Sequence, residues 1–109
     1  MFDLNKVMEM VEGDKELLKE LLNLFFSDYP EKLAKIHHAL EKNDAKTVYE
    51  TAHSLKGACG NLGLSRAYNL SLEIEKMCKE GKLERVEEAY KKLVKELDEF
   101  KQFVSDINL

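Results

Sequence analysis

The chain has 109 residues, the length of one ordinary domain, so residues 1–109 are expected to form a single folding unit. A hydrophobic content of 44% excludes wholesale disorder and is enough for a core without disulfide or metal cross-links. The net charge of −4 comes from interspersed acids and bases, which excludes the basic footprint of a nucleic-acid-binding protein.

The N-terminal half is predicted to form two helices. Asp3 can cap a short first helix that ends near Val11. Asp14 can cap a second, long helix that continues to about Lys42. The apolar positions of this second helix keep helical spacing on both sides of Pro30, so the proline is expected to kink the helix or to split it. These positions are Leu17, Leu18, Leu21, Leu22, Phe25, Leu33, Ile36 and Leu40.

A third helix is predicted from Ala45 to about Leu62. Its apolar positions follow one another at intervals of four, three, four and three residues, which is the pattern of one seam of a helical bundle. They are Val48, Ala52, Leu55, Cys59 and Leu62. His53 directly follows Ala52 of this stripe and so lies about 100° from it, and we expect it on the flank of the helix rather than in the core.

The remaining sequence predicts two more helices. The fourth is expected to be capped by Ser65 and to run to about Glu80, and the fifth runs from about Leu83 to Ile107. Because the connections are short, successive helices are expected to lie antiparallel and adjacent. We therefore predict an all-α fold, an antiparallel up-down-up-down four-helix bundle, with the short N-terminal helix as an additional cap or lid.

The turn between the third and fourth helices determines which of their residues lie at the same height. The turn is centred near Leu64, with His53 eleven residues before it and Glu75 eleven residues after it. Glu75 is therefore predicted to stand opposite His53, where a carboxylate can fix the tautomer of the imidazole and free its other nitrogen as a nucleophile. The alternative is that Glu75 pairs on the surface with Lys79, four residues further along the same helix.

The face of the third helix around His53 has an unusual composition. Lys56, Gly57 and Gly60 all fall within about 60° of His53 on the helix. Glycine inside a helix costs roughly 1 kcal/mol relative to alanine, so these glycines mark positions where a bare backbone is needed. They either leave room for a docking protein or allow close packing inside the bundle, and the hairpin register places Tyr68 near Gly60.

Two segments of the third helix and the turn after it carry a family resemblance. The sequence HSLKG over residues 53–57, together with NLGL over residues 61–64, resembles the signature of histidine-containing phosphotransfer (HPt) domains. The resemblance covers most of the chain, since the long kinked helix, the histidine helix, the short turn and two further helices follow in the same order. It implies a phosphorelay module. Its histidine takes a phosphoryl group from an aspartyl phosphate of one receiver domain and passes it to the aspartate of another.

The resemblance also implies a role for each residue of this face. His53 is the expected phospho-acceptor, and Lys56 is the residue that stabilises the phosphoryl group. Glu75 stands where the family often places a glutamine or glutamate that orients the imidazole. Gly57 is the small residue that admits the docking partner, and Gly60 belongs either to the same docking surface or to the packing of the bundle.

Two other functions are compatible with this sequence. One is the phosphotransfer domain of a chemotaxis-type histidine kinase, phosphorylated by an ATP-binding domain. That relative tends to carry a second histidine where this chain has Leu72, which favours the relay module. The other is a non-catalytic helical adaptor in which His53 takes no part in chemistry.

The expected partners are receiver domains or a hybrid histidine kinase. They are expected to bind the face around His53, and Val7 and Val11 of the first helix are expected to extend that face. No cluster of acidic residues accompanies His53, so Mg²⁺ is expected on the receiver and no cofactor is expected on this chain. The domain is thus predicted to be a monomeric phosphocarrier rather than a complete enzyme.

No targeting segment is recognisable in the chain. The first residues, Met1–Leu4, have neither the basic start nor the apolar run of a signal peptide, and no apolar run approaches the roughly 20 residues of a membrane span. Cys59 and Cys78 occupy apolar helical positions and are interpreted as reduced core residues, with a disulfide as the less favoured alternative. These features favour a cytoplasmic protein with neither nucleic acid nor membrane as a partner.

Overall fold

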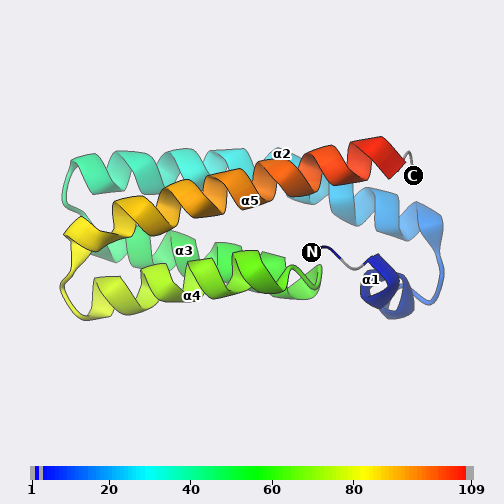
Figure 1. Cartoon of the computed structure of the whole chain (residues 1–109), viewed down its shortest axis with the longest axis horizontal. Helices are drawn as coiled ribbons and strands as arrows, with labels where there is room; N and C mark the ends of the chain where they lie inside the picture. Colours follow the sequence, from blue (N-terminus) through cyan, green and yellow to red (C-terminus); the bar gives the residue numbers. More distant parts are fainter. Residues whose placement is uncertain (1, 3, 108–109) are drawn as a thin grey trace.

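The computed structural model describes residue 2 and residues 4–107, and this part of the chain contains five α-helices and no strand. The helices are α1 (Leu4–Met10), α2 (Lys15–Glu41), α3 (Ala45–Asn61), α4 (Ser65–Lys79) and α5 (Val86–Ile107), with a short 3₁₀ turn, η1 (Leu83–Arg85), before α5. The four long helices run alongside one another and α1 lies at one end of the bundle (Figure 1). Within the described range, no helix has the combination of length and apolar character that a membrane span requires. The predicted all-α bundle with an additional N-terminal helix is confirmed.

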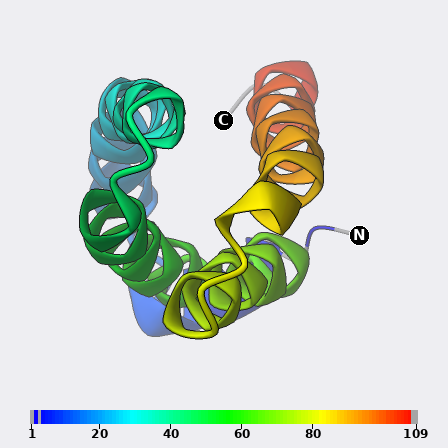
Figure 2. The ribbon, with the colours of Figure 1, turned by 90° about the vertical axis from the view of Figure 1, so that its left-hand side faces the viewer.

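The bundle is not equally tight on all sides. Seen along its length, the long helices follow one another around the bundle in chain order, and the widest gap separates α2 from α5 (Figure 2). The closest packing is between α3 and α4, whereas α2 and α5 approach each other at few positions. Short connections explain this difference, because they hold each helix against the next one, and α2 and α5 are not consecutive.

Aspartate side chains begin two of the long helices. Asp14 accepts a hydrogen bond from the backbone N–H of Leu17, and Asp44 accepts one from Thr47, each at 3.1 Å. These bonds pair N–H groups that have no partner within the first turn of a helix. Asp14 is therefore the cap that the sequence predicts, while the predicted cap at Asp3 lies outside the described residues.

Two predicted helix starts are wrong by one turn or less. Ser65 is already part of α4, and Leu64 occupies the N-cap position with no side-chain hydrogen bond. Leu64 is buried, so apolar packing rather than a polar cap holds this turn in place. The expected start of the fifth helix is instead the tighter η1, in which the N–H of Arg85 donates to the carbonyl of Lys82 at 3.0 Å.

Pro30 lies inside α2 without splitting it. The helix is continuous from Lys15 to Glu41, so of the two expected alternatives the split is wrong. The part of α2 that precedes the proline tilts away from the line of the rest (Figure 1). Such a bend is the expected result of a residue that lacks the N–H for the helical hydrogen bond and crowds the preceding turn.

The core is one cluster of apolar side chains contributed by all five helices. All five predicted core residues of the third helix are buried. On α2 the apolar spacing predicts more buried residues than the structure has. Leu17 and Leu21 are exposed, although their spacing placed them on the core face. The largest fully buried side chains include Phe100, Leu18, Ile36, Leu55, Ile74, Leu93 and Leu97.

Both cysteines are free thiols, as the sequence predicts. Cys59 is fully buried, and burial raises the pKa of its thiol to about 12. Cys78 is only half-buried, at the edge of the core, and burial also raises its pKa, with a smaller contribution from the charge of Glu75. A raised pKa disfavours the thiolate, which is the nucleophilic form of cysteine.

Candidate functional site

The side chain of His53 stands on the surface of α3 beside α4. It is 62% exposed, and its Nδ1 atom lies 3.3 Å from Oε1 of Glu75. The Glu75 side chain comes from α4 and is only 7% exposed. The predicted pairing across the α3–α4 hairpin is therefore present, and its carboxylate is held inside the bundle while the imidazole reaches outward.

Lys56 approaches the same carboxylate oxygen. Its Nζ atom lies 2.9 Å from Oε1 of Glu75, and its side chain is 17% exposed. The pKa of Lys56 is raised above its ordinary value, chiefly because the Glu75 carboxylate stabilises the charged ammonium group by hydrogen bonding, while partial burial opposes the shift. The sequence predicts Lys56 near His53 but not this ion pair, since helix geometry alone does not say which way a long flexible side chain turns.

The alternative pairing of Glu75 with Lys79 is not the arrangement that the structure shows. The structure places Lys79 elsewhere, with its Nζ atom 5.4 Å from the centre of the Tyr49 ring. The Tyr49 ring is in turn stacked against the imidazole of His53, with ring centres 6.2 Å apart and planes inclined by 14°. Sequence reasoning did not place Tyr49 beside His53. The signal that could have marked it is its position four residues before His53, which places both on one helix face.

The two glycines of the face have different surroundings. A Cβ atom added to Gly57 would meet no atom within 4 Å. Gly57 thus borders open space, and the helix-packing alternative for this position is not supported. A Cβ atom at Gly60 would lie 3.3 Å from the ring of Tyr68, the neighbour that the hairpin register predicts, so Gly60 leaves room for this exposed ring on the surface of the α3–α4 pair.

An exposed apolar surface adjoins this face, and sequence reasoning missed it. Leu24 of α2 is 69% exposed, and Leu21 and Leu17, one and two turns earlier, are exposed as well. A hollow of about 350 Å³ lies between α2 and α3 at this place, lined by Leu21, Leu24, Phe25, Asp28, Ala58, Asn61 and Leu62. The signal in the sequence is that apolar residues of this segment cover more than one face of the helix, which is wider than burial requires.

The hollow is continuous with the row of residues that begins at His53. His53, Gly57 and Asn61 are separated by four residues each, so they lie one above the other on α3, and Asn61 lines the hollow. The expected extension of the face by Val7 and Val11 is wrong. Both valines are buried in the core, because α1 turns its apolar side toward the end of the bundle.

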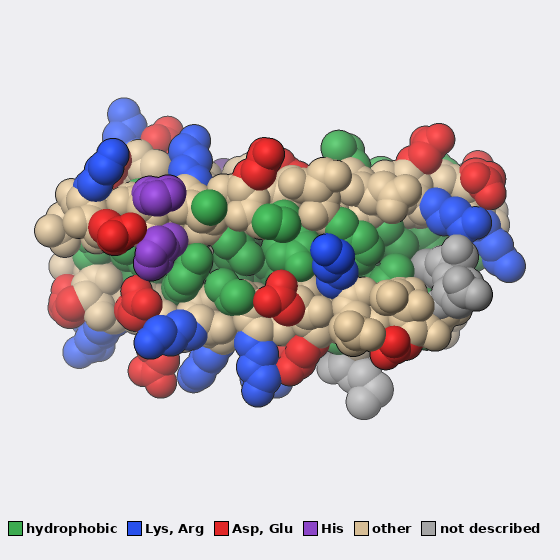
Figure 3. All heavy atoms as spheres, turned by 90° about the horizontal axis from the view of Figure 1, so that it is seen from above, with side chains coloured by type: hydrophobic (Ala, Val, Ile, Leu, Met, Phe, Trp, Pro, Cys, Tyr) green, Lys and Arg blue, Asp and Glu red, His purple; other side chains and the backbone are tan. Residues whose placement is uncertain are grey.

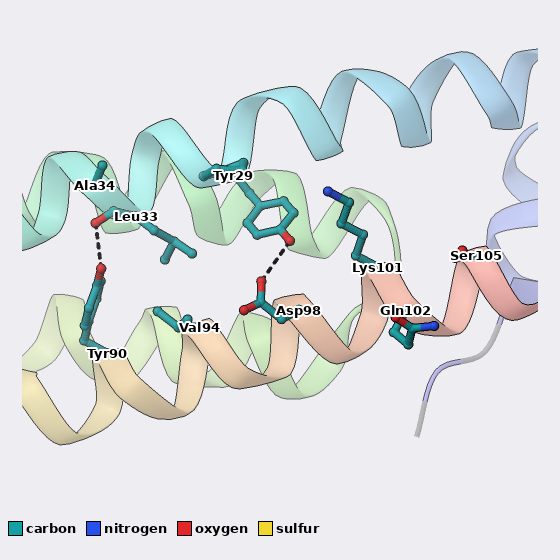
Figure 4. Close-up of a pocket in the computed structure, with 10 residues that line it drawn as sticks. Tyr29, Leu33, Ala34, Tyr90, Val94, Asp98, Lys101, Gln102 and Ser105 are labelled. Carbon is teal, nitrogen blue, oxygen red and sulfur yellow. Dashed lines mark hydrogen bonds between the residues drawn. The ribbon is translucent and has the colours of Figure 1, made fainter.

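A second concave region lies between α2 and α5. A strip of apolar side chains runs along it between charged borders (Figure 3). Two tyrosines connect the helices there: the hydroxyl of Tyr29 donates to Asp98 and that of Tyr90 donates to the backbone carbonyl of Leu33, each at 3.0 Å (Figure 4). The hydroxyl of each tyrosine points across the gap, so these side chains hold the helices together rather than forming a reactive cluster.

Metal-ligating side chains do not gather in the part of the chain that the structure describes. Among residue 2 and residues 4–107, no group of three or more His, Cys, Asp or Glu side chains is arranged to hold a metal ion. His37 and His38 are exposed. Nε2 of His37 lies 3.4 Å from Oε1 of Glu41, and Nδ1 of His38 lies 3.7 Å from the same oxygen. They are surface side chains.

The match to a known family agrees with this geometry. A model of the Hpt domain family matches residues 20–103, which is more than half of the chain. The chain belongs to the Hpt domain family. The matched range contains all five predicted site residues, namely His53, Lys56, Gly57, Gly60 and Glu75, whereas α1 precedes it.

Two curated relatives contain regions similar to this Hpt domain. It is 32% identical over 105 residues to the phosphorelay intermediate protein rdeA of Dictyostelium discoideum, an alignment that covers 96% of the chain and 41% of that protein. It is 26% identical over 106 residues to the signal transduction histidine-protein kinase BarA of Shigella flexneri, an alignment that covers 96% of the chain and 12% of that protein. The chain thus spans less than half the length of these relatives.

Two solved structures have the same fold. The histidine-containing phosphotransfer protein B (HptB) of Pseudomonas aeruginosa PAO1 superposes with a TM-score of 0.89 at 26% identity, covering 96% of this chain and 91% of that one. The HPT domain of a sensor hybrid histidine kinase from Shewanella superposes with a TM-score of 0.81 at 27% identity, covering 99% of this chain and 97% of that one. The similarity extends over nearly the whole length of both domains, so it includes the α3–α4 hairpin that holds the site.

Proposed function

We propose that this Hpt domain is a phosphorelay intermediate whose His53 receives a phosphoryl group from a receiver aspartyl phosphate and passes it to the aspartate of another receiver. The observation that carries this proposal is the contact between Nδ1 of His53 and the buried carboxylate of Glu75. An ionised carboxylate only accepts hydrogen bonds, so it favours the neutral tautomer whose proton is on Nδ1. The lone pair of Nε2 is then free to act as the nucleophile.

The chemical step uses only these groups and the receiver. Nε2 attacks the phosphorus, and an N–P bond forms while the P–O bond to the aspartate breaks, with its electron pair leaving on the carboxylate. Positive charge develops on the imidazole as the bond forms, and the Glu75 carboxylate beside Nδ1 stabilises it. Transfer to the second receiver is the same step in reverse.

Lys56 is the cation nearest to this chemistry. In the resting domain its ammonium group pairs with Glu75, which keeps it within one helical turn of His53. We assign it the role of a point charge that turns toward the phosphoryl oxygens when they arrive, since lysine is a flexible cation with rotatable donors. The chain is in this proposal a phosphocarrier, and the receiver supplies the aspartate and the Mg²⁺.

The receiver is proposed to dock over Gly57 and the apolar hollow between α2 and α3. Three properties support this surface: the open space at Gly57, the exposed leucines of α2, and the unbroken row from His53 to Asn61. A contiguous exposed apolar patch on a small protein commonly marks an interaction site. The names of the relatives, a phosphorelay intermediate and histidine kinases, support receivers or a hybrid kinase as the partners.

The test is phosphoryl transfer from a panel of labelled receiver domains in the presence of Mg²⁺. Label that is acid-labile and alkali-stable, and that appears on the wild type but not on His53→Gln, is the expected result. Label on both proteins would refute the site. If an ATP-dependent kinase labels the chain and no receiver does, the chain is the phosphotransfer domain of such a kinase. If neither source labels it, the non-catalytic helical adaptor is the remaining function.

A further inference from the structure

An exposed histidine must be held in place if only one of its nitrogens is to react. The contact with Glu75 holds one edge of the His53 ring, at Nδ1, but 62% of the side chain is exposed to solvent. A single contact at one edge leaves the plane of the ring free to swing about that edge. A second contact, on the face of the ring, is needed to fix the plane.

Tyr49 makes this second contact. Its ring lies nearly parallel to the imidazole, with planes inclined by 14° and centres 6.2 Å apart, within the range of attractive aromatic pairs. Both residues belong to α3, with Tyr49 one turn earlier. Side chains on a helix lean toward its N-terminus, so the imidazole of His53 lies over the turn that carries Tyr49.

Lys79 holds Tyr49 from the neighbouring helix. Its Nζ atom lies 5.4 Å from the centre of the tyrosine ring, within the distance of a cation–π interaction. Lys79 follows Glu75 by four residues, so both point from the same face of α4 toward α3. One face of α4 thus anchors the imidazole directly through Glu75 and indirectly through Lys79 and Tyr49.

We propose that Tyr49 is a positioning residue for His53, and that Lys79 supports it by holding the tyrosine ring. This inference rests on the proposed role of His53 as the phospho-acceptor. The tyrosine neither touches the phosphoryl group nor exchanges a proton with it. It keeps the plane of the imidazole such that Nδ1 stays beside Glu75 and Nε2 points away from α4 toward the incoming phosphorus.

The predicted consequence is a slower transfer when the aromatic face is removed. Tyr49→Leu keeps an apolar side chain at this half-buried position, and Tyr49→Phe keeps the ring without the hydroxyl. We expect the single-turnover rate of transfer from a phosphorylated receiver to fall on the order of tenfold in Tyr49→Leu, because orientation of the nucleophile is lost. Tyr49→Phe should restore the wild-type rate, and Lys79→Met should slow transfer by about twofold.

A second readout follows the imidazole itself. Nitrogen-15 NMR of His53 distinguishes the tautomer with the proton on Nδ1 from the one with the proton on Nε2. The wild type and Tyr49→Phe should hold the proton on Nδ1, whereas Tyr49→Leu should give a mixture of tautomers. A purely structural tyrosine would change the thermal midpoint without changing this ratio.

The matched control is a second tyrosine stacked on a histidine. Tyr90 stacks against His37 with ring centres 6.1 Å apart, away from the α3–α4 hairpin. Tyr90→Ala should lower the thermal midpoint and leave both the transfer rate and the His53 tautomer unchanged. An equal loss of transfer in Tyr90→Ala and Tyr49→Leu would show that loss of stability, not of position, slows the reaction.

The outcomes separate this inference from the proposed function. If Tyr49→Leu transfers at the wild-type rate with its proton on Nδ1, while His53→Gln is unlabelled, the positioning role is wrong and the phospho-acceptor stands. If no receiver labels the wild type, the NMR ratio still decides whether Tyr49 orients the ring. An unchanged ratio in folded Tyr49→Leu overturns the inference by itself.

Discussion

The α3–α4 face and the α2–α5 groove are built in opposite ways. On the α3–α4 face the helices pack closely, and a histidine and a lysine converge on one buried carboxylate oxygen. Between α2 and α5 the helices are further apart, and the groove, of about 580 Å³, is crossed by tyrosine hydrogen bonds at only two described places. The groove is therefore not where the reactive groups meet.

This contrast indicates what a phosphocarrier requires. A small-molecule enzyme encloses its substrate, and its reactive groups usually lie in the best-formed pocket. In the proposed reaction the histidine must instead enter the active site of another protein, so it has to project from the surface. In that proposal the receiver supplies the concave part of the reaction site, and this domain contributes an outward-facing side chain with its support beneath it.

The strongest way to break the comparison is to remove the projecting group. His53→Gln should abolish phosphorylation completely and leave the fold intact, since the side chain is on the surface and the core does not depend on it. The measurement is label transfer from a phosphorylated receiver, with the circular dichroism melt as the control for folding. Residual label on His53→Gln would place the acceptor elsewhere.

Removing the support should have the next largest effect. Glu75→Ala leaves the imidazole without its partner at Nδ1 and leaves Lys56 without its counter-ion, so we expect transfer to fall on the order of a hundredfold. Glu75→Gln keeps an oxygen acceptor of the same shape and should lose less. Single-turnover kinetics of the two variants measure this, and equal rates for Glu75→Ala and wild type would contradict the orienting role.

Gly57 tests whether the open space is used by a partner. Gly57→Leu should slow transfer by about tenfold because the side chain would project into the docking surface. It should raise the free energy of unfolding by roughly 1 kcal/mol, because leucine replaces glycine at an exposed position inside a helix. The transfer rate is measured as a function of receiver concentration, and the free energy of unfolding is measured by a urea melt. A fall in stability would instead assign the glycine to the fold.

The smallest effect on transfer is expected from the groove. Burial, with help from the neighbouring Asp98, raises the pKa of Tyr29 from 10.0 to about 12. A raised pKa in the folded state means that the stabilisation is complete below pH 10 and is lost as the pH rises from 10 to about 12. Tyr29→Phe should cost about 1 kcal/mol at neutral pH, flatten this alkaline loss relative to the wild type, and leave transfer unchanged. Slower transfer in this variant would mean that the groove takes part in the reaction.

Sequence reasoning succeeded where one short connection fixes the geometry. The turn near Leu64 is enough to place Glu75 opposite His53 and Tyr68 beside Gly60, because residues at equal distances from a tight turn meet. The same reasoning cannot place the end of a long side chain. For that reason the ion pair of Lys56 with Glu75 and the position of Lys79 over Tyr49 emerged only from the structure.

The exposed leucines show a different limit. Helical spacing identifies an apolar face, but it does not say how much of that face the neighbouring helices cover. Leu17 and Leu21 lie at positions that would be buried if the bundle enclosed the beginning of α2 completely. Their exposure depends on where the other helices end, which is a property of the assembled bundle.

The short connection between α3 and α4 also has a consequence for folding kinetics. Only residues 62–64 separate the two helices, so the contact between His53 and Glu75 forms over a short stretch of chain and needs little loop closure. Contacts that are local in sequence form early and quickly. The pairing that prepares the histidine is therefore expected to arise before α5 and α1 dock. Amide hydrogen exchange should show the hairpin as one cooperative unit that persists when the ends of the bundle open.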